Sequence, residues 1–267
     1  ASNVPRLDYS DGGCPSLLLE PTATNLITYS EDFSNASWSK GPTIITPNSA
    51  ISPDGTLNAS LWSHSGGSFP QLSLPGITFV GGANYTPSLY VKSDGTSQVQ
   101  HSLLVNNVVV NFTPTNEWVR ISDLIVSPDT SGSFVIAQNS SSAVSASFYI
   151  WGASLEQNSH ATSYIKTVGS PQTRVADTAS GSGSSTVINS SEGVLYFEGI
   201  ATNPSVSANS QISISSATNS GNNRVMITPG SDTQLTLRFN AGGTQLVTQA
   251  VAVSSLSVNS KIAVRWG

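Results

Sequence analysis

Hydrophobic residues in this chain form short runs in which apolar and polar positions alternate. The run at residues 148–155, FYIWGASL, carries bulk at both alternating sets of positions, which predicts a buried central strand. Strict alternation would place on one face Tyr149, Trp151, Ala153 and Leu155. Further runs precede it at intervals of about 8–12 residues, as is typical of a β-sandwich or barrel. The predicted strands before it are 43–46, 59–63, 69–74, 85–92, 99–105, 108–112, 117–126 and 133–137.

Turn-forming sequences separate these runs, and one of them predicts a tight hairpin. Asn106 and Asn107 lie between two apolar runs, and asparagine tolerates the positive φ that such a turn requires. No segment keeps a helical period, so we expect any helix to be only a turn or two long. After the central strand, residues 162–177 predict an exit peptide that leaves the sandwich.

The second part of the chain repeats the pattern after a segment rich in glycine and serine, which is typical of a linker. Further strands are predicted at 194–200, 211–215, 224–228, 234–239, 245–253 and 261–266. We therefore expect an all-β chain of two tandem β-sandwiches. Its predicted parts are an N-terminal arm at 1–24, a first sandwich at 25–175, a linker at 176–190 and a second sandwich at 191–267. Both termini are abrupt, so we expect both ends to be incomplete and the second sandwich to be partial.

Composition favours an ordered protein with a weakly charged surface. Charged residues are 9% of the chain and hydrophobic residues 37%, whereas a disordered chain carries more charge and fewer apolar residues. The net charge is -5 and the ten Lys and Arg are scattered, which excludes a surface for nucleic acid. No apolar run approaches the roughly 20 residues that span a bilayer, so we expect no membrane insertion. Cys14 is the only cysteine, and its place in a turn favours a small turn residue over a reactive thiol.

The sequence contains no set of residues arranged for catalysis. Its three histidines, His64, His101 and His160, are far apart, and it has neither a nucleophile elbow nor a metal-ligating histidine pair. Glu117 and Glu156 are the candidates for an acid pair, and nothing in their spacing brings them across a cleft, as glycoside hydrolysis requires. We therefore expect a protein that is not an enzyme.

Aromatic residues beside polar groups are candidates for sugar binding, because a ring offers a flat apolar face. Each can equally be a core residue, which is the role we expect for Trp38. Trp62, next to a glycine turn, is our first choice of sugar platform. The candidate glycan-binding residues are Trp62, His64, Tyr85, Tyr90 and Trp118.

The end of the first sandwich carries a resemblance to a known family. The stretch WGASLEQNSHATSYIKTVGSPQTRVADTAS at 151–180 resembles a segment that recurs in bacteriophage virion proteins, usually tail fibres or related appendages. The stretch PRLDYSDGGCPSLLLEPTATNLITYSEDFSNASW at 5–38 is similar to its usual upstream companion. In that family the two flank a jelly roll of the carbohydrate-binding-module type. The second sandwich likewise resembles the opening of a concanavalin-A-like (laminin-G-like) domain.

The resemblance implies a tail fibre or spike on the virion exterior that presents its sandwiches to host-surface glycans. It implies partners among other virion proteins and a homo-oligomer, by analogy a trimer. An alternative is a purely structural virion component, such as a fibre-attachment, baseplate or capsid-decoration protein, with no glycan binding. A depolymerase subunit would need an acid pair that the sequence does not show.

Jelly rolls of this type often hold a calcium ion, so the resemblance also suggests a metal site near the N-terminal loop and the last strand. The candidate ligands are Glu31, Asp32 and Glu156, whose carboxylates are the hard oxygen ligands that calcium prefers. The alternative is that they are solvated turn acids and one strand glutamate. We expect no other cofactor.

Overall fold

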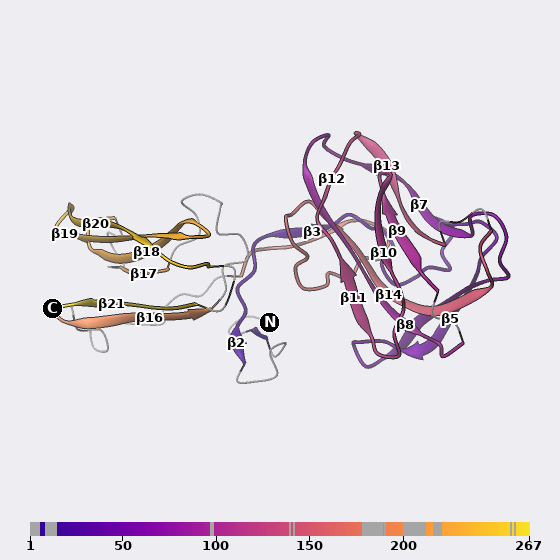
Figure 1. Cartoon of the computed structure of the whole chain (residues 1–267), viewed down its shortest axis with the longest axis horizontal. Coiled ribbons are helices and arrows are strands. Elements are labelled where there is room, and N and C mark those ends of the chain that lie inside the picture. Colours follow the sequence, from indigo (N-terminus) through magenta and orange to yellow (C-terminus); the bar gives the residue numbers. More distant parts are fainter. Residues whose placement is uncertain are drawn as a thin grey trace. The chain divides into compact units, whose positions relative to one another are not determined.

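The computed structural model describes residues 6–8, 15–96, 99–138, 140, 142–177, 189, 191–199, 212–215, 221–256, 258 and 260–267. These residues form strands, turns and loops without a helix, so the expectation of an all-β chain is confirmed (Figure 1). The chain divides into two compact units, unit 1 at Ala1–Thr178 and unit 2 at Ala179–Gly267. Within the described ranges, nothing forms a helix of the length and apolarity that a membrane crossing requires. Cys14 and most of the predicted linker lie outside the described residues.

Unit 1 is a sandwich of two antiparallel sheets (Figure 1). The five-stranded sheet has, from edge to edge, the order β10 (Val108–Phe112), β9 (His101–Val105), β13 (Ser131–Ala137), β7 (Gln71–Thr78) and β4 (Ser39–Lys40). The six-stranded sheet has the order β11 (Val119–Ser122), β8 (Asn84–Ser93), β14 (Ala146–Glu156), β6 (Leu57–His64) and β5 (Ile44–Ile51), with β12 (Ile125–Val126) also beside β8. Every strand predicted before residue 148 overlaps one of these, and the run at 117–126 is divided between β11 and β12.

The core lies between the two sheets. β14 is paired on both sides, with β6 and β8, which confirms the prediction of a central strand. Phe148 and Ile150 of this strand are fully buried. Trp38, which we expected in the core, is 1% exposed, and its ring centroid lies 5.2 Å from that of Phe33 and 6.1 Å from that of Phe134.

The alternation of β14 is broken in its middle, so the prediction of one continuous face is wrong. Gly152 has a φ of 63°, and the register with β8 shifts after Trp151. A bulge of this kind changes which face the following residues take. Tyr149 and Trp151 therefore point to the outer face of the sheet, whereas Ala153 and Leu155 lie in the core.

The hairpin predicted at Asn106 and Asn107 is confirmed. Val105 pairs with Val108, and the two asparagines have φ values of 47° and 66°. Positive φ at both central residues matches the right-handed twist of the flanking strands. The turn joins β9 and β10, which pair along their whole length.

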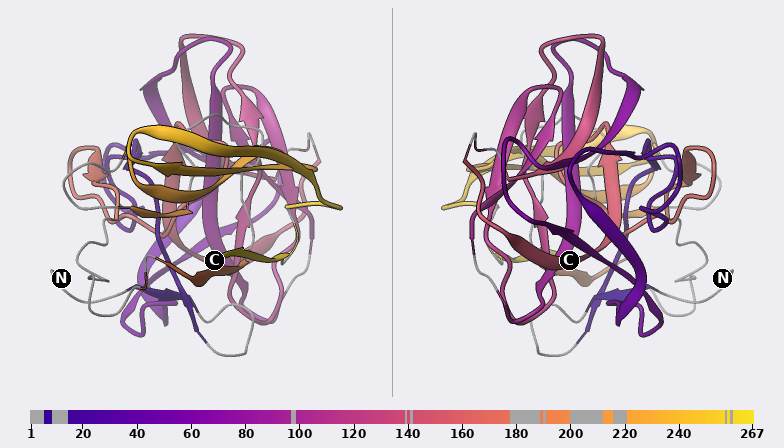
Figure 2. Two further views of the ribbon diagram at one scale, coloured as in Figure 1. Left: turned by 90° about the vertical axis from the view of Figure 1, so that its left-hand side faces the viewer. Right: turned by 90° about the vertical axis from the view of Figure 1, so that its right-hand side faces the viewer.

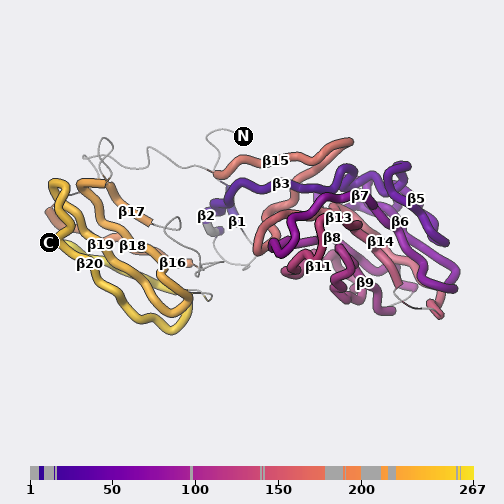
Figure 3. The backbone as a smooth tube through the Cα atoms, turned by 90° about the horizontal axis from the view of Figure 1, so that it is seen from above, coloured from indigo at the N-terminus to yellow at the C-terminus, as the bar shows by residue number. Residues whose placement is uncertain are grey.

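The N-terminal arm and the exit peptide meet in unit 1. After β1 (Leu7–Asp8) and β2 (Ser16–Leu17), β3 (Ala23–Asn25) pairs antiparallel with β15 (Gln172–Arg174), and Figure 3 shows the two side by side. Arg6 binds the carboxylate of Asp177 at 2.6 Å, and Arg174 lies 3.3 Å from the carboxylate of Glu20. The exit peptide therefore returns to the arm before it leaves unit 1.

Asn25, at the end of β3, connects the N-terminal arm to β14 through buried hydrogen bonds. Its side chain is fully buried, and its amide donates to the backbone oxygens of Ala153 at 3.1 Å and Ile165 at 2.8 Å. Its side-chain oxygen accepts from the backbone N–H groups of Ile27 and Leu155, both at 3.1 Å. The amide thus uses all of its hydrogen-bonding capacity, as a buried polar side chain must to avoid a desolvation penalty.

Unit 2 is a smaller sandwich. Its four-stranded sheet has the order β17 (Ile212–Ser215), β18 (Arg224–Ser231), β19 (Gln234–Ala241) and β20 (Thr244–Ala252), which lie side by side in Figure 2. The second layer is the pair β16 (Gly193–Gly199) and β21 (Ser260–Trp266). Ile227, Leu235 and Leu256 form a core on which Leu195 and Ile262 pack from that pair. Its likeness to a concanavalin-A-like domain stays a prediction.

We expect Asn25→Ala to destabilise unit 1 by about 3 kcal/mol or more, because two backbone N–H groups and two carbonyls lose their partners in a buried place. Urea unfolding of the full chain, followed by tryptophan fluorescence, measures this. Asn111→Ala is the control, since Asn111 is exposed and accepts one hydrogen bond, from Ser102. The control should cost less than about 1 kcal/mol. Equal stabilities of the two variants would contradict the role of Asn25.

Candidate functional site

Trp62, the first choice of sugar platform, lies in the core, so that prediction is wrong. Its side chain is 0% exposed because it pairs across the sheet with Phe148, and both side chains point inward. The centroid of its ring lies 4.8 Å from that of His64, 5.3 Å from that of His101 and 4.9 Å from that of Phe148. His64, 5% exposed, is buried with it and cannot contact a sugar on the surface.

The two buried histidines are held neutral. His64 Nδ1 accepts the backbone N–H of Gly66, and burial lowers the pKa of His64. His101 Nδ1 lies 2.8 Å from the carbonyl oxygen of Val99, and burial lowers the pKa of His101 to about 4. A charged imidazolium would lose its hydration among these aromatic rings, which favours the neutral form.

Tyr85 is also a core residue, and the prediction of a sugar contact there is wrong. It is 1% exposed, and its ring centroid lies 5.0 Å from that of Phe79. Its hydroxyl accepts the backbone N–H of Val80 at 2.8 Å. This bond satisfies the polar end of a buried tyrosine and fixes the loop before β8.

Tyr90 and Trp118, the other two candidates, lie together on the outer face of the six-stranded sheet. The register pairs Tyr90 with Arg120 and Lys92 with Tyr149, and Trp118 immediately precedes Val119, the partner of Val91. This places one surface over three neighbouring strands. We call it the outer aromatic face and define it by residues that are all half-buried: Tyr90, Lys92, Trp118, Arg120 and Tyr149.

The face consists of two adjacent rows across β11, β8 and β14. One row is Trp118, Lys92 and Tyr149, and the other is Arg120 and Tyr90, which the buried Trp151 continues on β14. In the second row the guanidinium carbon of Arg120 lies 5.5 Å from the ring centroid of Tyr90. The ring of Tyr90 lies 5.3 Å from that of Trp151, centroid to centroid. Cation–π and edge-to-face contacts of this kind fix the rings.

Arg120 is anchored below the surface. Its Nε and Nη2 donate to the hydroxyl of Ser88 at 3.2 and 2.9 Å, and its Nη1 donates to the carbonyl of Thr162 at 2.6 Å. Nη2 also lies 3.9 Å from the fully buried carboxylate of Glu156. These contacts use most of the donors of the guanidinium and pair its charge with a buried carboxylate, so Arg120 serves to position Tyr90.

Trp118 is fixed from the opposite edge of the sheet. Its indole N–H donates to the backbone carbonyl of Ile51 at 3.0 Å, at the end of β5. β11 and β5 are the two edge strands of the sheet order, so this bond joins the two ends of the sheet. The ring is thereby held in one orientation, and little side-chain entropy remains to be lost when a ligand binds.

The calcium interpretation of Glu31, Asp32 and Glu156 is wrong for the part of the chain that the structure describes. Within it, no three His, Cys, Asp or Glu side chains gather where they could hold a metal ion.

The three carboxylates bind protein donors instead. Glu156 accepts the backbone N–H and hydroxyl of Thr162, and Glu31 binds Lys166 at 2.7 Å. Asp32 accepts the hydroxyl of Ser34. The carboxylates of Glu31 and Glu156 are therefore engaged by the fold, and Asp32 is an exposed turn acid.

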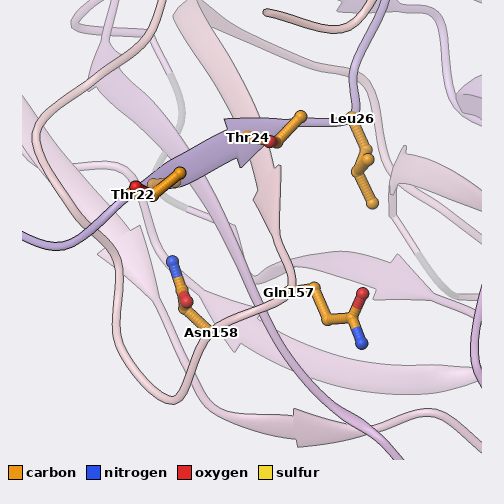
Figure 4. Close-up of a pocket in the computed structure, with 6 residues that line it drawn as sticks. Thr22, Thr24, Leu26, Gln157 and Asn158 are labelled. Atoms are coloured by element: carbon orange, nitrogen blue, oxygen red, sulfur yellow. The ribbon is translucent and has the colours of Figure 1, made fainter. Parts of the chain in front are cut away.

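A pocket of about 300 Å³ lies between β3 and the loop after β14 (Figure 4). The residues that line it are Thr22, Ala23, Thr24, Leu26, Gln157 and Asn158. The hydroxyl of Thr24 bonds that of Thr173, and the hydroxyl of Thr22 accepts the backbone N–H of Ala176. The six lining residues include no ring and no charge, and two of their hydroxyls hold the exit peptide. The pocket is therefore the weaker candidate site.

The outer face of the five-stranded sheet differs in chemistry. The register places Val109, Leu104 and Val135 side by side across β10, β9 and β13. The aromatic residues of these strands, Phe112 and Phe134, lie in the core. This aliphatic surface lacks a ring on which a sugar could stack, so the outer aromatic face is the candidate site.

Sequence reasoning missed several residues of this site: Lys92, Arg120, Tyr149, Trp151 and the supporting Tyr164. Tyr149 was detectable in principle, because it alternates with the core residues Phe148 and Ile150. Tyr164 was not, because it lies in a segment without strand pattern. Its ring centroid is 4.6 Å from that of Trp151, and its hydroxyl bonds Ser30.

No protein-family model matches the chain, and no curated protein matches it. Among solved structures, arabinose-bound α-L-arabinofuranosidase MgGH51 is 14% identical, with a TM-score of 0.41 over 50% of this chain and 26% of that chain. The C-terminal family 22 carbohydrate-binding module of Clostridium thermocellum Xyn10B is 14% identical, with a TM-score of 0.39 over 52% of this chain and 96% of that chain.

A structure titled "CBM4 structure and function" has a TM-score of 0.36 and 14% identity, and the match covers 50% of this chain and 99% of that one. Against the first enzymes found, the match spans only 25–30% of their length. These TM-scores are all below 0.5, so the likeness does not indicate what this chain binds.

We expect the stability of unit 1 to fall as the pH falls from about 6.5 towards 4. The folded pKa of His101 lies below the unfolded one, so its contribution is complete above the unfolded pKa and is lost on acidification. The lowering from 6.5 to about 4 corresponds to about 3 kcal/mol. Urea unfolding at pH 7 and pH 4.5 measures this.

His101→Phe keeps an aromatic ring among Phe112, Phe148 and Trp62 and removes the titrating group. It should lose less stability between the two pH values than the unaltered chain does. The same loss in both proteins would show that other groups cause the acid sensitivity.

Proposed function

We propose that unit 1 is a carbohydrate-binding module and that the chain is part of a bacteriophage tail fibre, spike or related appendage that attaches to host-surface glycans. The observation that carries the glycan part is the outer aromatic face, where Tyr90, Trp118 and Tyr149 are half-buried on a sheet and not in the core. Rings fixed on a rigid sheet bind with a small loss of conformational entropy.

The neighbourhood of the face suits a sugar, which has an apolar C–H surface and a rim of hydroxyls. Next to the row of Trp118, Lys92 and Tyr149, the register places Ser147 opposite Ser63 on the same face. Rings can pack on the apolar side of a pyranose, and these hydroxyls can exchange hydrogen bonds with its rim. The carboxylate of Glu156 is buried and accepts the hydroxyl of Thr162, so it is not exposed to a sugar on this face.

The virion part of the proposal is supported by the two sequence motifs at 5–38 and 151–180. They resemble segments of phage appendage proteins and include the arm and the exit peptide of unit 1. Other virion proteins and further copies of the chain, as a trimer, are the proposed partners.

We expect Trp118→Ala and Tyr149→Ala each to weaken adsorption of the full chain to host cells or isolated host glycans by about tenfold or more. Removing an anchoring ring from a binding surface costs more than about 1 kcal/mol. Binding to a glycan array and to intact cells of candidate hosts measures this, with urea unfolding to show that the fold is kept.

Tyr196→Ala is the matched control, because Tyr196 is 55% exposed and belongs to unit 2. It should leave adsorption unchanged. If the chain binds no host surface or glycan while it binds other virion proteins, the purely structural alternative replaces this proposal.

A further inference from the structure

We propose that the outer aromatic face selects glycans that carry a carboxylate, and that Lys92 is the residue that recognises it. This inference rests on the proposed function, because it specifies the ligand of the same face. Lys92 lies between the aromatic side chains of Trp118 and Tyr149.

Lys92 occupies the centre of the row that it forms with Trp118 and Tyr149. Its strand, β8, lies between β11 and β14, and the register pairs Lys92 directly with Tyr149 on one side. On the other side, the pairing of Val119 with Val91 brings Trp118 next to it. A sugar stacked on either ring would therefore place its substituents beside the ammonium group.

The ammonium of Lys92 is free to bind a ligand. In the described part of the chain it takes part in no ion pair, whereas Lys166 pairs with Glu31 and Lys261 with Glu198. Lys92 is half-buried, and a lysine in such a place commonly packs its apolar stem and keeps its ammonium group in water. Partial burial also lowers the effective dielectric, which strengthens attraction to an anion.

Lys92 is the unpaired cation of the face. Arg120 lies in the adjacent row beside Tyr90, but its charge is balanced by the buried carboxylate of Glu156, 3.9 Å from its Nη2. The nearest acid along β8 is Asp94, two residues further on the same face and about 7 Å along the strand. Its carboxylate accepts hydrogen bonds from Ser147 and Thr96, and its pKa is lowered despite desolvation.

Asp94 is therefore charged at neutral pH, and its carboxylate binds the hydroxyls of Thr96 and Ser147. The face is therefore positive at Lys92 and negative at the end where Asp94 lies. A carboxylate-bearing sugar, such as a uronic or sialic acid residue, fits the positive part, and its neutral neighbours fit the rings.

The test uses matched pairs of polysaccharides: polygalacturonate, hyaluronan, alginate and polysialic acid, each native and carboxyl-reduced, with neutral dextran and xylan. Carboxyl reduction removes the charge and keeps the sugar backbone. We expect the full chain to bind at least one native acidic polymer about tenfold more tightly than its reduced form. Raising the salt from about 0.05 M to about 0.5 M should reduce this preference, because screening weakens a charge contact at the surface.

Lys92→Met keeps the length of the stem and removes the charge. It should abolish the preference, so that the native and the reduced polymer bind equally well. Lys40→Met is the control with the same change in net charge, because Lys40 is exposed on β4 in the other sheet. It should retain the preference.

The outcomes separate this inference from the proposed function. Equal binding of native and reduced polymers, with loss of both in Trp118→Ala, would overturn the role of Lys92 and leave glycan binding intact. A preference that survives in Lys92→Met would likewise overturn it. Absence of binding to every polysaccharide and every host surface would overturn both.

Discussion

The buried amide of Asn25 is the constraint on which unit 1 depends, because it ties the beginning of the sandwich to β14 and to the segment after it. Ser30 extends this buried set of hydrogen bonds, which we call the polar seam. Its hydroxyl accepts the backbone N–H of Thr167 and bonds the hydroxyl of Tyr164 at 2.6 Å. Tyr164 packs on Trp151, which packs on a ring of the outer aromatic face. A polar seam deep in the fold therefore sets the position of the rings at the surface.

The seam also gives a physical reason for two sequence motifs to occur together. The motif at 5–38 contributes Glu20 and Asn25, and the motif at 151–180 contributes Arg174 and Asp177. Glu20 accepts the backbone N–H of Ser163 at 2.6 Å and lies within ion-pair distance of Arg174. Either motif alone would leave charges and amides partly buried without partners, which costs more than a single contact contributes. Removing a partner in one motif would therefore leave its counterpart in the other without a hydrogen bond or an ion pair.

Most strands could be predicted from the sequence, because alternation and turn residues are local signals. The Asn106–Asn107 hairpin is an example, since the residue type itself favours the required φ. The site could not be predicted in the same way. Trp62 and Tyr149 look equivalent as aromatic strand residues, yet Trp62 pairs with Phe148 and points inward, so Tyr149 points outward. That difference is fixed by the register between strands, which local sequence does not encode.

Because the chain carries few charges, the ammonium group of Lys92 has a strong effect on the potential of the outer aromatic face. Only 9% of the residues are charged, so few neighbours are available to compensate an ammonium group at the surface. Along β8, the face changes from Tyr90 beside Arg120, through Lys92, to Asp94 with its hydroxyl partners. A ligand with its anionic group at one end is attracted by Lys92 and repelled by Asp94, so its two orientations along β8 differ in energy. The rings would then supply affinity, and the order of charges along β8 would decide which way a bound chain of sugars runs.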